Sequence, residues 1–299
     1  MYDVIIIGGG PAGLSAGIYA ARARLKTAIL EKQMPGGQAG VTDFIENYPG
    51  YPDGVQGSEL AMKMLEQAQK FGCEFLYNEV AHVDLTNKKV TTSSGEYTWK
   101  ALIICTGADP RSLNIPGEDT LTGRGISFCA TCDGALFSGK TVAVIGGGDS
   151  AVKEALFLTK FASKVFVIHR RDELRAEKII QEKAFDNPRI EFIWDTVATA
   201  ISGEQRVTGV TVKNVKTGRE KTLSVDGIFI YIGRMPNTSL FDVEKDSGYI
   251  VTDENMHTSV AGVFAAGDCR KKQHRQVATA VGDGAAAAMS AEEYISGLE

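Results

Sequence analysis

Residues 4–13 of the chain read Val-Ile-Ile-Ile-Gly-Gly-Gly-Pro-Ala-Gly, and residues 142–151 repeat the pattern as Val-Ala-Val-Ile-Gly-Gly-Gly-Asp-Ser-Ala. Each copy begins with a short apolar run rich in β-branched residues, which is typical of a buried parallel strand. Each run ends in a glycine-rich turn, and small apolar residues at helical spacing follow the turn. Both copies therefore predict a strand, a tight turn and a helix, which is the context of a dinucleotide-binding site.

The glycines of the first copy have separate physical roles. Gly8 permits the tight turn, Gly10 lets the backbone approach a pyrophosphate, and Gly13 lets the helix pack closely on the strand. The pyrophosphate is expected against the amide groups at the positive end of the helix. The residues expected to bind nucleotide in these turns are Gly8, Gly10, Pro11, Ala12 and Gly13, and then Gly146, Gly148, Asp149 and Ser150.

The residue after the second strand of each unit distinguishes the two sites. Glu31 follows the strand expected over residues 26–30, where a carboxylate would accept hydrogen bonds from ribose hydroxyls. The same offset in the second unit leads to a basic cluster formed by His169, Arg170, Arg171 and Arg175. Guanidinium groups bind a 2′-phosphate with charge-assisted hydrogen bonds, so the second site is expected to prefer NADP(H) to NAD(H). The alternative interpretation of the cluster is a solvated basic surface.

The order of the segments predicts an α/β protein with two Rossmann-like dinucleotide-binding domains of three-layer ββα type. The chain has 299 residues, which is enough for two domains. Its last strand ends at Gly267-Asp268, and a helix rich in small residues follows. A strand and a helix cannot form a domain alone, so they are expected to complete the first unit. We therefore place one domain over residues 1–112 and 240–299, with the second, residues 113–239, inserted into it.

Composition excludes several classes of protein. The net charge of −5 gives no electrostatic footprint for nucleic acid or for an anionic membrane. No apolar segment approaches the length that spans a bilayer, and the N-terminal residues lack the basic region of a secretory signal. We expect a cytoplasmic protein. The five cysteines and four histidines are too scattered to predict a structural zinc site, so no metal is expected.

One close cysteine pair, Cys129-Ala-Thr-Cys132, lies shortly before the second glycine turn. In such a pair one thiolate attacks a disulfide while its partner resolves the mixed disulfide. Asp133 follows at once and is a candidate proton donor or acceptor, although an aspartate before Gly134 also suits a turn. A flavin accepts hydride from nicotinamide and reduces disulfides, so FAD is expected in the first site and NADPH in the second.

Taken together, these motifs resemble those of the bacterial-type, low-molecular-weight thioredoxin reductases over essentially the whole chain. The resemblance rests on specific segments, namely Gly8–Gly13, Gly36–Gln38, Cys129–Asp133, Gly146–Ala151, His169–Arg171 with Arg175, Gly267-Asp268 and Arg275–Val277.

The resemblance implies more than the residues do alone. It implies that two electrons pass from NADPH through FAD and the Cys129/Cys132 disulfide to oxidised thioredoxin, with Cys132 facing the flavin, Cys129 attacking thioredoxin and Asp133 as the acid. It also implies a homodimer whose NADPH domain rotates between half-reactions. The residues that it places along FAD, beyond the glycine turn and Glu31, are Gly37, Gln38, Asn47, Gly267, Asp268, Arg275, Gln276 and Val277.

Alternatives remain open at the level of the sequence. The partner could be a peroxiredoxin- or glutaredoxin-like protein, or the electron donor could be ferredoxin. The protein could also be a flavin-containing NADPH sensor or oxidase whose close cysteine pair is structural. Cys105 and Cys269 are expected to be small core residues at the ends of buried strands.

Overall fold

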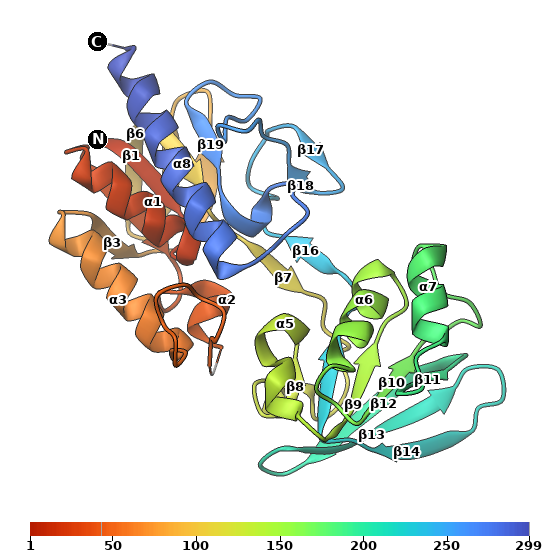
Figure 1. The fold of residues 1–299 in the computed structure, drawn as a ribbon. Coiled ribbons are helices and arrows are strands. Elements are labelled where there is room, and N and C mark those ends of the chain that lie inside the picture. Colours follow the sequence, from red (N-terminus) through yellow and green to blue (C-terminus); the bar gives the residue numbers. More distant parts are fainter. Residues whose placement is uncertain (43, 299) are drawn as a thin grey trace. The chain divides into compact units, whose positions relative to one another are not determined.

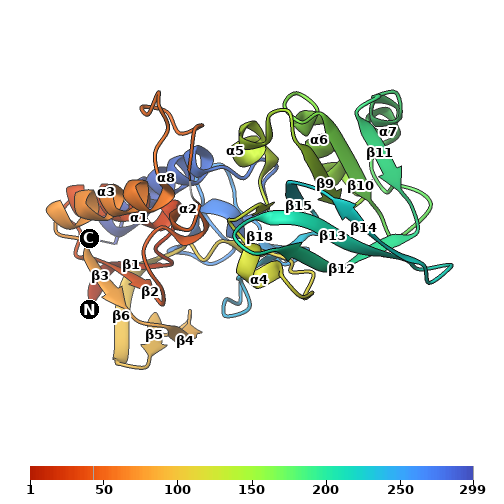
Figure 2. The same cartoon turned by 90° about the horizontal axis from the view of Figure 1, so that it is seen from below.

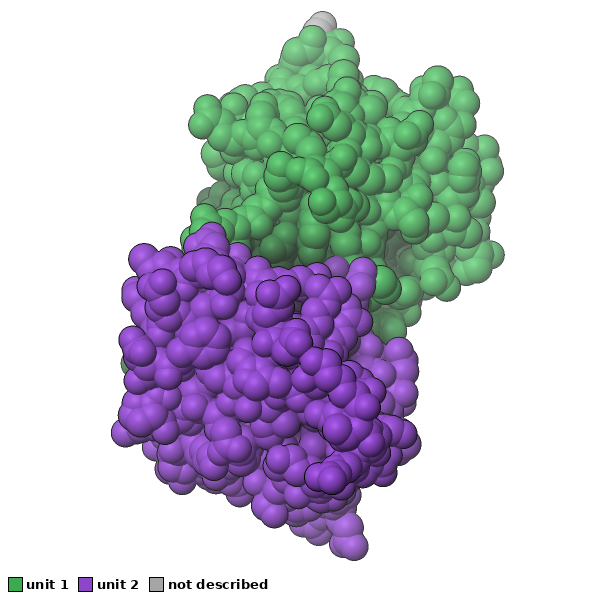
Figure 3. Space-filling view, turned by 90° about the vertical axis from the view of Figure 1, so that its right-hand side faces the viewer, with its two compact units in different colours: residues 1–109, 235–299 green, residues 110–234 purple. Residues whose placement is uncertain are grey.

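The computed structural model describes residues 1–42 and 44–298, which form two compact units. The first unit comprises Met1–Asp109 and Met235–Glu299, and the second comprises Pro110–Arg234 (Figure 3). The boundaries expected after residues 112 and 239 thus lie a few residues too far along the chain. The reason is local structure, because the chain passes from one unit to the other within two short paired strands, β7 (Ala108–Pro110) and β16 (Arg234–Pro236).

A seven-stranded sheet forms the centre of the first unit (Figure 1). Its parallel part has the order β3-β2-β1-β6, and β19 pairs in parallel with the end of β6, so the C-terminal segment completes this sheet. An antiparallel ribbon of β4 and β5 continues from the start of β6. The strands are β1 (Tyr2–Ile7), β2 (Thr27–Glu31), β3 (Glu74–Tyr77), β4 (Val80–Asp84), β5 (Lys89–Thr92), β6 (Gly95–Ile104) and β19 (Val263–Ala265).

Both faces of this sheet are covered, which explains why β1 is apolar from Val4 to Ile7. Val4 and Ile6 pack into a core beneath helices α1, α3 and α8, whereas Ile5 and Ile7 pack into a second core on the opposite face. This is the pattern expected of a parallel strand buried on both faces. The helical and short elements of the unit are α1 (Pro11–Arg22), α2 (Gly37–Gly40), α3 (Gly57–Lys70), β17 (Lys245–Asp246), β18 (Tyr249–Ile250), η2 (Gly267–Cys269) and α8 (Val277–Ser296).

The second unit repeats the architecture on a smaller scale. Its parallel sheet has the order β11-β10-β9-β15-β8, and a three-stranded antiparallel sheet β12-β13-β14 packs on one face through a shared apolar core (Figure 2). Helices α5, α6 and α7 belong to the other side of the parallel sheet. The strands are β8 (Ile126–Ser127), β9 (Thr141–Ile145), β10 (Lys164–Ile168), β11 (Ile190–Ile193), β12 (Thr196–Gly203), β13 (Val207–Asn214), β14 (Glu220–Ser224) and β15 (Gly227–Ile230). The helices are α4 (Glu118–Leu121), α5 (Ala130–Asp133), η1 (Gly134–Phe137), α6 (Asp149–Leu158) and α7 (Lys178–Phe185).

The predicted fold class is therefore confirmed, with helices, a parallel sheet and a smaller β layer in each unit. In the part of the chain that the structure describes, none of the helices has the length and apolar character that crossing a membrane requires.

Candidate active site

The first glycine turn joins β1 to α1 and leaves an open cradle at its centre. Gly8 has a φ of 108°, and a Cβ atom there would overlap the carbonyl group of Cys105. A Cβ at Gly13 would overlap the carbonyl oxygen of Gly8, so α1 lies directly against the turn. By contrast, a Cβ at Gly10 would have no described heavy atom within 4 Å. Since Gly10 begins α1 and lacks a capping side chain, this opening at the helix N-terminus fits a pyrophosphate.

Glu31 ends β2 and lies beside this cradle. Its Oε2 accepts a hydrogen bond from the Gly9 N–H at 2.7 Å, and its Oε1 accepts one from the Gln33 N–H at 2.9 Å. These two bonds fix the orientation of the carboxylate while each oxygen keeps a further lone pair. Glu31 is thus held in an orientation in which it could accept hydrogen bonds from ribose hydroxyls.

Several other residues expected along FAD also lie close to the first turn. The Gly36 N–H donates to the Gly9 carbonyl at 2.8 Å, and a Cβ at Gly37 would lie 3.3 Å from the Gly10 Cα. Gln38 follows in the same short helix, where its side-chain amide donates to the Asp109 carboxylate at 3.0 Å. The loop of residues 36–38 therefore borders the cradle.

Asn47 and the start of α8 are joined by their side chains. Asn47 Nδ2 donates to Gln276 Oε1 at 3.1 Å, and Gln276 caps α8 through a reciprocal capping box with Thr279. The guanidinium of Arg275 lies over the ring of Tyr249, at 4.4 Å from its centre. Its Nε atom is buried and has no hydrogen-bond partner among the described residues. A buried donor left unpaired in this way fits an oxygen of a bound cofactor.

A partly buried group of charges supports the turn that carries Gly267 and Asp268. Asp283 of α8 accepts hydrogen bonds from the Gly267 N–H at 3.0 Å, Lys272 Nζ at 2.9 Å and Arg270 Nη1 at 3.0 Å. Lys272 Nζ also lies 3.7 Å from Asp268 Oδ1. The four side chains are 11 to 24% exposed. This group was not predicted from the sequence, although the lone aspartate within the small-residue helix, Asp283, was a usable signal.

The charge group also places Asp268 at the first cradle. A Cβ at Gly267 would lie 2.9 Å from the Ala12 Cβ, so the turn of Gly267 and Asp268 contacts the start of α1. The glycine turn, Glu31, the 36–38 loop and this turn thus form one site within the first unit.

The second glycine turn, between β9 and α6, has the same central opening. Gly146 has a φ of 150°, and a Cβ there would overlap the Tyr231 carbonyl oxygen. A Cβ at Gly148 would have no described heavy atom within 4 Å. Asp149 begins α6 and accepts the Glu177 N–H at 2.8 Å, whereas Ser150 is exposed in the first helical turn. This opening also fits a pyrophosphate.

The basic cluster lies at the end of β10 in the second unit. His169 is buried, and its ring occupies the space that a Cβ on Gly147 would need. Burial lowers the pKa of His169, and the positive charges of the neighbouring arginines act in the same direction, so the neutral ring is favoured. The Arg175 N–H donates to the Gly147 carbonyl at 2.8 Å, which holds the segment beside the turn. The side chains of Arg170, Arg171 and Arg175 are exposed and form a cationic site that fits a 2′-phosphate.

The redox pair forms a disulfide, which joins Cys129 and Cys132 across the short helix α5. The backbone N–H groups of Cys132 and Asp133 donate to the Cys129 carbonyl at 3.2 and 3.1 Å. Ser127, two residues before the pair, donates its hydroxyl hydrogen to Asp133 Oδ2 at 2.5 Å and accepts the Cys129 N–H at 3.0 Å. The predicted residues Cys129, Cys132 and Asp133 are therefore brought together, and Ser127 joins them.

A buried tyrosine supports the same segment from the end of β15. The Tyr231 hydroxyl accepts the Ala130 N–H at 2.6 Å, and burial strongly raises the pKa of Tyr231. Glu154 of α6 is a close electrostatic neighbour, and burial raises the pKa of its carboxyl group. This arrangement has no signature in the sequence, because Ala130, Glu154 and Tyr231 are far apart along the chain.

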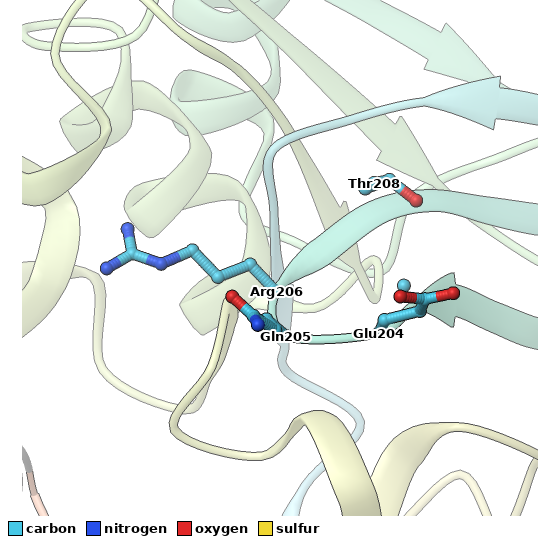
Figure 4. A pocket seen from close by; sticks show the side chains of 5 residues that line it. Glu204, Gln205, Arg206 and Thr208 are labelled. Carbon is cyan, nitrogen blue, oxygen red and sulfur yellow. The ribbon is translucent and has the colours of Figure 1, made fainter.

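The described residues offer no cluster for a metal ion, and one pocket lies away from the candidate site. Within residues 1–42 and 44–298, no group of three or more His, Cys, Asp or Glu side chains is placed to bind a metal ion. A pocket on the hairpin between β12 and β13, lined by Gly203–Arg206 and Thr208, contains none of the predicted site residues (Figure 4). Cys105 and Cys269 are buried, in agreement with their expected core role.

Comparison with known proteins decides the family. Residues 2–284 match the model of the pyridine nucleotide-disulphide oxidoreductase family. The thioredoxin reductase of Treponema pallidum is 50% identical over 302 residues, covering 100% of this chain and 98% of the relative. That of Bacillus subtilis is 47% identical over 305 residues, covering 100% and 96%. The chain belongs to this family, among the low-molecular-weight thioredoxin reductases.

Solved structures of family members support the same assignment. The thioredoxin reductase of Streptococcus pyogenes is 48% identical and matches with a TM-score of 0.93, covering 99% of each chain. That of Lactococcus lactis, solved in a state named the FR conformation, is also 48% identical but matches with a TM-score of 0.69, covering 99% of this chain and 100% of its own. Relatives of equal identity thus differ in how well their whole chains superpose on this one.

Proposed function

We propose that the protein is an NADPH-dependent thioredoxin-disulfide reductase. It passes two electrons from NADPH through FAD and the Cys129/Cys132 disulfide to the disulfide of oxidised thioredoxin. The observation that carries this proposal is the disulfide itself, which lies beside Asp133 in the same compact unit as the second glycine turn and its arginines. The full-length relatives named thioredoxin reductase support it, and they do not favour a peroxiredoxin-like partner or ferredoxin as the donor.

The first unit is the FAD site in this proposal. Bound FAD supplies the chemistry that accepts a hydride and reduces a disulfide. Gly10 and the N-terminus of α1 receive the pyrophosphate, and Glu31 accepts hydrogen bonds from ribose. Asp268, beside the first cradle, and the buried Nε of Arg275 supply further polar contacts to the cofactor.

The second unit binds NADPH and carries the dithiol. Gly148 and the first turn of α6 receive the pyrophosphate, while Arg170, Arg171 and Arg175 bind the 2′-phosphate. Because NADH lacks that phosphate, these arginines discriminate between the two nicotinamide cofactors.

The dithiol exchange proceeds in two balanced steps. The thiolate of reduced Cys129 attacks one sulfur of the thioredoxin disulfide, which forms a mixed disulfide and releases the other thioredoxin sulfur as a thiolate that takes up a proton. The thiolate of Cys132 then attacks Cys129 Sγ, which restores the Cys129–Cys132 disulfide and releases the second thioredoxin thiolate. Asp133 gives or takes a proton during these steps.

The proposed reaction also requires the second unit to move. Both the dithiol and the nicotinamide belong to the second unit, and both must reach one flavin, so the second unit rotates between half-reactions about the β7 and β16 crossings. We further propose that the protein is a cytoplasmic homodimer, without a nucleic-acid or membrane partner. Sedimentation is expected to give the mass of a dimer.

The rotation has its own test. A covalent link between the two units is expected to stop turnover. Full turnover of the linked protein would contradict the rotation.

Stopped-flow spectroscopy on the FAD-loaded protein tests the function. Rapid loss of oxidised-flavin absorbance with NADPH is expected, with slow loss for NADH and none for reduced ferredoxin. Addition of oxidised thioredoxin is then expected to restore the absorbance. A flavin that NADPH does not reduce, or one that ferredoxin reduces faster, would overturn the proposed donor. A reduced flavin that thioredoxin does not reoxidise would overturn the proposed partner.

A further inference from the structure

We propose that Ser127 is a positioning residue whose hydroxyl group reverses its hydrogen bonds when Asp133 gains or loses a proton. This inference rests on the proposed function, because it assigns a role in the dithiol exchange. It concerns a residue outside the Cys-x-x-Cys motif, and all of its contacts lie within the second unit.

The backbone holds the Ser127 hydroxyl in place. Ser127 is 6% exposed and ends β8, where it lies opposite Phe229 in the parallel ladder with β15. Its Oγ lies 2.5 Å from Asp133 Oδ2, 3.0 Å from the Cys129 nitrogen and 3.3 Å from the Cys129 carbonyl oxygen. One buried oxygen atom therefore contacts both the expected acid and the backbone of the attacking cysteine.

Counting hydrogens shows why two states are possible. A serine hydroxyl has one hydrogen to donate and two lone pairs that accept. When Asp133 is ionised, the hydroxyl donates to its carboxylate and accepts the Cys129 N–H. When Asp133 is protonated, its hydroxyl hydrogen donates to Ser127 Oγ, and the Ser127 hydrogen turns to the Cys129 carbonyl oxygen. In both states the Ser127 oxygen stays hydrogen-bonded to Asp133 and to the Cys129 backbone, so Asp133 exchanges a proton without moving its carboxyl group.

The hydrogen bond from Ser127 influences whether Asp133 is ionised, and other charged and titratable groups lie nearby. The elements packed around α5 contribute the phenol of Tyr231, the carboxyl of Glu154 on α6 and the guanidinium of Arg234. Glu154, Arg234 and Asp133 each interact electrostatically with Tyr231. Ser127 bonds both forms of Asp133, but the hydrogen bond to the ionised carboxylate is charge-assisted and the stronger of the two, so Ser127 favours the ionised form. Removal of the Ser127 hydroxyl is therefore expected to raise the pKa of Asp133 and to leave the Cys129 N–H without its partner.

The test is the pH profile of thioredoxin reduction by the FAD-loaded protein. Each rising or falling part of the profile, called a limb here, reflects the protonation of one group. The limb that disappears in Asp133→Asn is the one that reflects the protonation of Asp133. In Ser127→Ala this limb is expected to move to higher pH by about one unit, the size of one charge-assisted hydrogen bond. We expect kcat to fall about tenfold with the KM for NADPH unchanged, because only the exchange step is affected. Ser127→Thr, which keeps the hydroxyl, is expected to restore the limb, whereas Ser127→Val is expected to behave like Ser127→Ala.

Two comparisons separate positioning from general loss of structure. Ser163→Ala removes a hydroxyl in the same unit that donates only to the Lys140 carbonyl among the bonds described, and it is expected to keep the wild-type profile. In an Asp133→Asn background, Ser127→Ala is expected to add little further loss. An unshifted limb in Ser127→Ala, or an equal loss in both backgrounds, would overturn the proposal. If wild-type protein does not reduce thioredoxin at all, the proposed function fails instead.

A second measurement keeps Ser127 and therefore does not depend on whether the Ser127 variants fold. Selective ¹⁵N labelling of cysteine gives at most five amide signals, because the chain has five cysteines. The Cys129 amide signal is expected to titrate with Asp133 in the wild-type protein and to lose that titration in Asp133→Asn. A Cys129 signal that is insensitive to Asp133 would contradict the switch.

Discussion

The two glycine turns share a backbone plan but differ at the residue that faces the turn from the helix. Gly13 of the first turn corresponds to Ala151 of the second. A Cβ at Gly13 would overlap the Gly8 carbonyl oxygen, whereas Ala151 is fully buried with its methyl group accommodated. The helix therefore approaches the strand more closely in the first unit.

The residues that follow the second strands differ in kind. Glu31 is tied by hydrogen bonds to the backbone of its own turn. His169 packs its ring against Gly147 and is buried, whereas Arg170, Arg171 and Arg175 are exposed. A fixed carboxylate suits a permanently bound cofactor, while an exposed cationic site suits a ligand that enters and leaves. In the proposed function, this difference lets the first turn retain FAD while the second exchanges NADPH.

The largest expected effect concerns the close helix approach in the first unit. Gly13→Ala is expected to destabilise the protein by about 4 kcal/mol or more and to abolish FAD retention, because its methyl group would overlap backbone atoms that cannot move away. Ala151→Gly, the matched exchange in the second unit, is expected to cost only about 1 kcal/mol. Flavin content per chain and thermal unfolding measure both. Stoichiometric FAD in Gly13→Ala would refute the difference between the turns.

Next in size is the charge group behind the first turn, which has no counterpart among the contacts described at the second. Asp283→Asn leaves Arg270 and Lys272, both largely buried, with less compensation and is expected to cost about 3 kcal/mol. The affinity for FAD is expected to fall with it, because Asp283 also holds the Gly267 N–H. Denaturant unfolding and FAD titration of the apoprotein measure the loss. Asp246→Asn, which removes an exposed pair with Lys271, is the control and is expected to change little; equal effects of the two variants would contradict this account.

A smaller effect is expected from the second turn, where charge sets selectivity. Replacing both Arg170 and Arg171 with alanine is expected to lower kcat/KM for NADPH about 100-fold, roughly tenfold for each lost charge-assisted contact, and to leave the value for NADH nearly unchanged. Arg206→Ala, in the hairpin pocket of the same unit, serves as the control (Figure 4). An equal loss with both cofactors would show that the arginines do not read the 2′-phosphate.

The smallest effect is a pH dependence at His169. Since burial lowers the pKa of His169 in the folded protein, the unfolded chain binds the proton more tightly. The contribution to stability is therefore complete above about pH 6.5, the usual pKa of histidine, and is lost as the pH falls below it. Unfolding free energies on both sides of this pH are expected to differ more in the wild type than in His169→Asn. An identical pH dependence in the two proteins would remove this role.

The sequence predicted the parts of the site that local spacing determines. The glycine turns, Glu31, the basic cluster and the Cys129/Cys132 pair depend on residues close together along the chain. Asp283 and Tyr231 could not be predicted, because their partners are brought to them by the return of α8 and by the parallel order of the second sheet. Ser127 lay beside the motif, but its role depends on the turn that brings Asp133 back to it.

The unit boundaries show the same limit. The order of motifs suggested crossings after residues 112 and 239, but pairing of β7 with β16 places them a few residues earlier. Such pairing depends on residues more than 100 positions apart, for which the sequence carries no local pattern.

Thioredoxin reduction by Cys129→Ser protein tests the central claim most directly. The FAD-loaded wild type is expected to reduce one thioredoxin disulfide for each NADPH oxidised. Cys129→Ser is expected to keep rapid flavin reduction by NADPH and to lose thioredoxin reduction, whereas Cys73→Ala, which removes a buried thiol of the first unit, is expected to keep both. Thioredoxin reduction at the wild-type rate by Cys129→Ser would contradict the account.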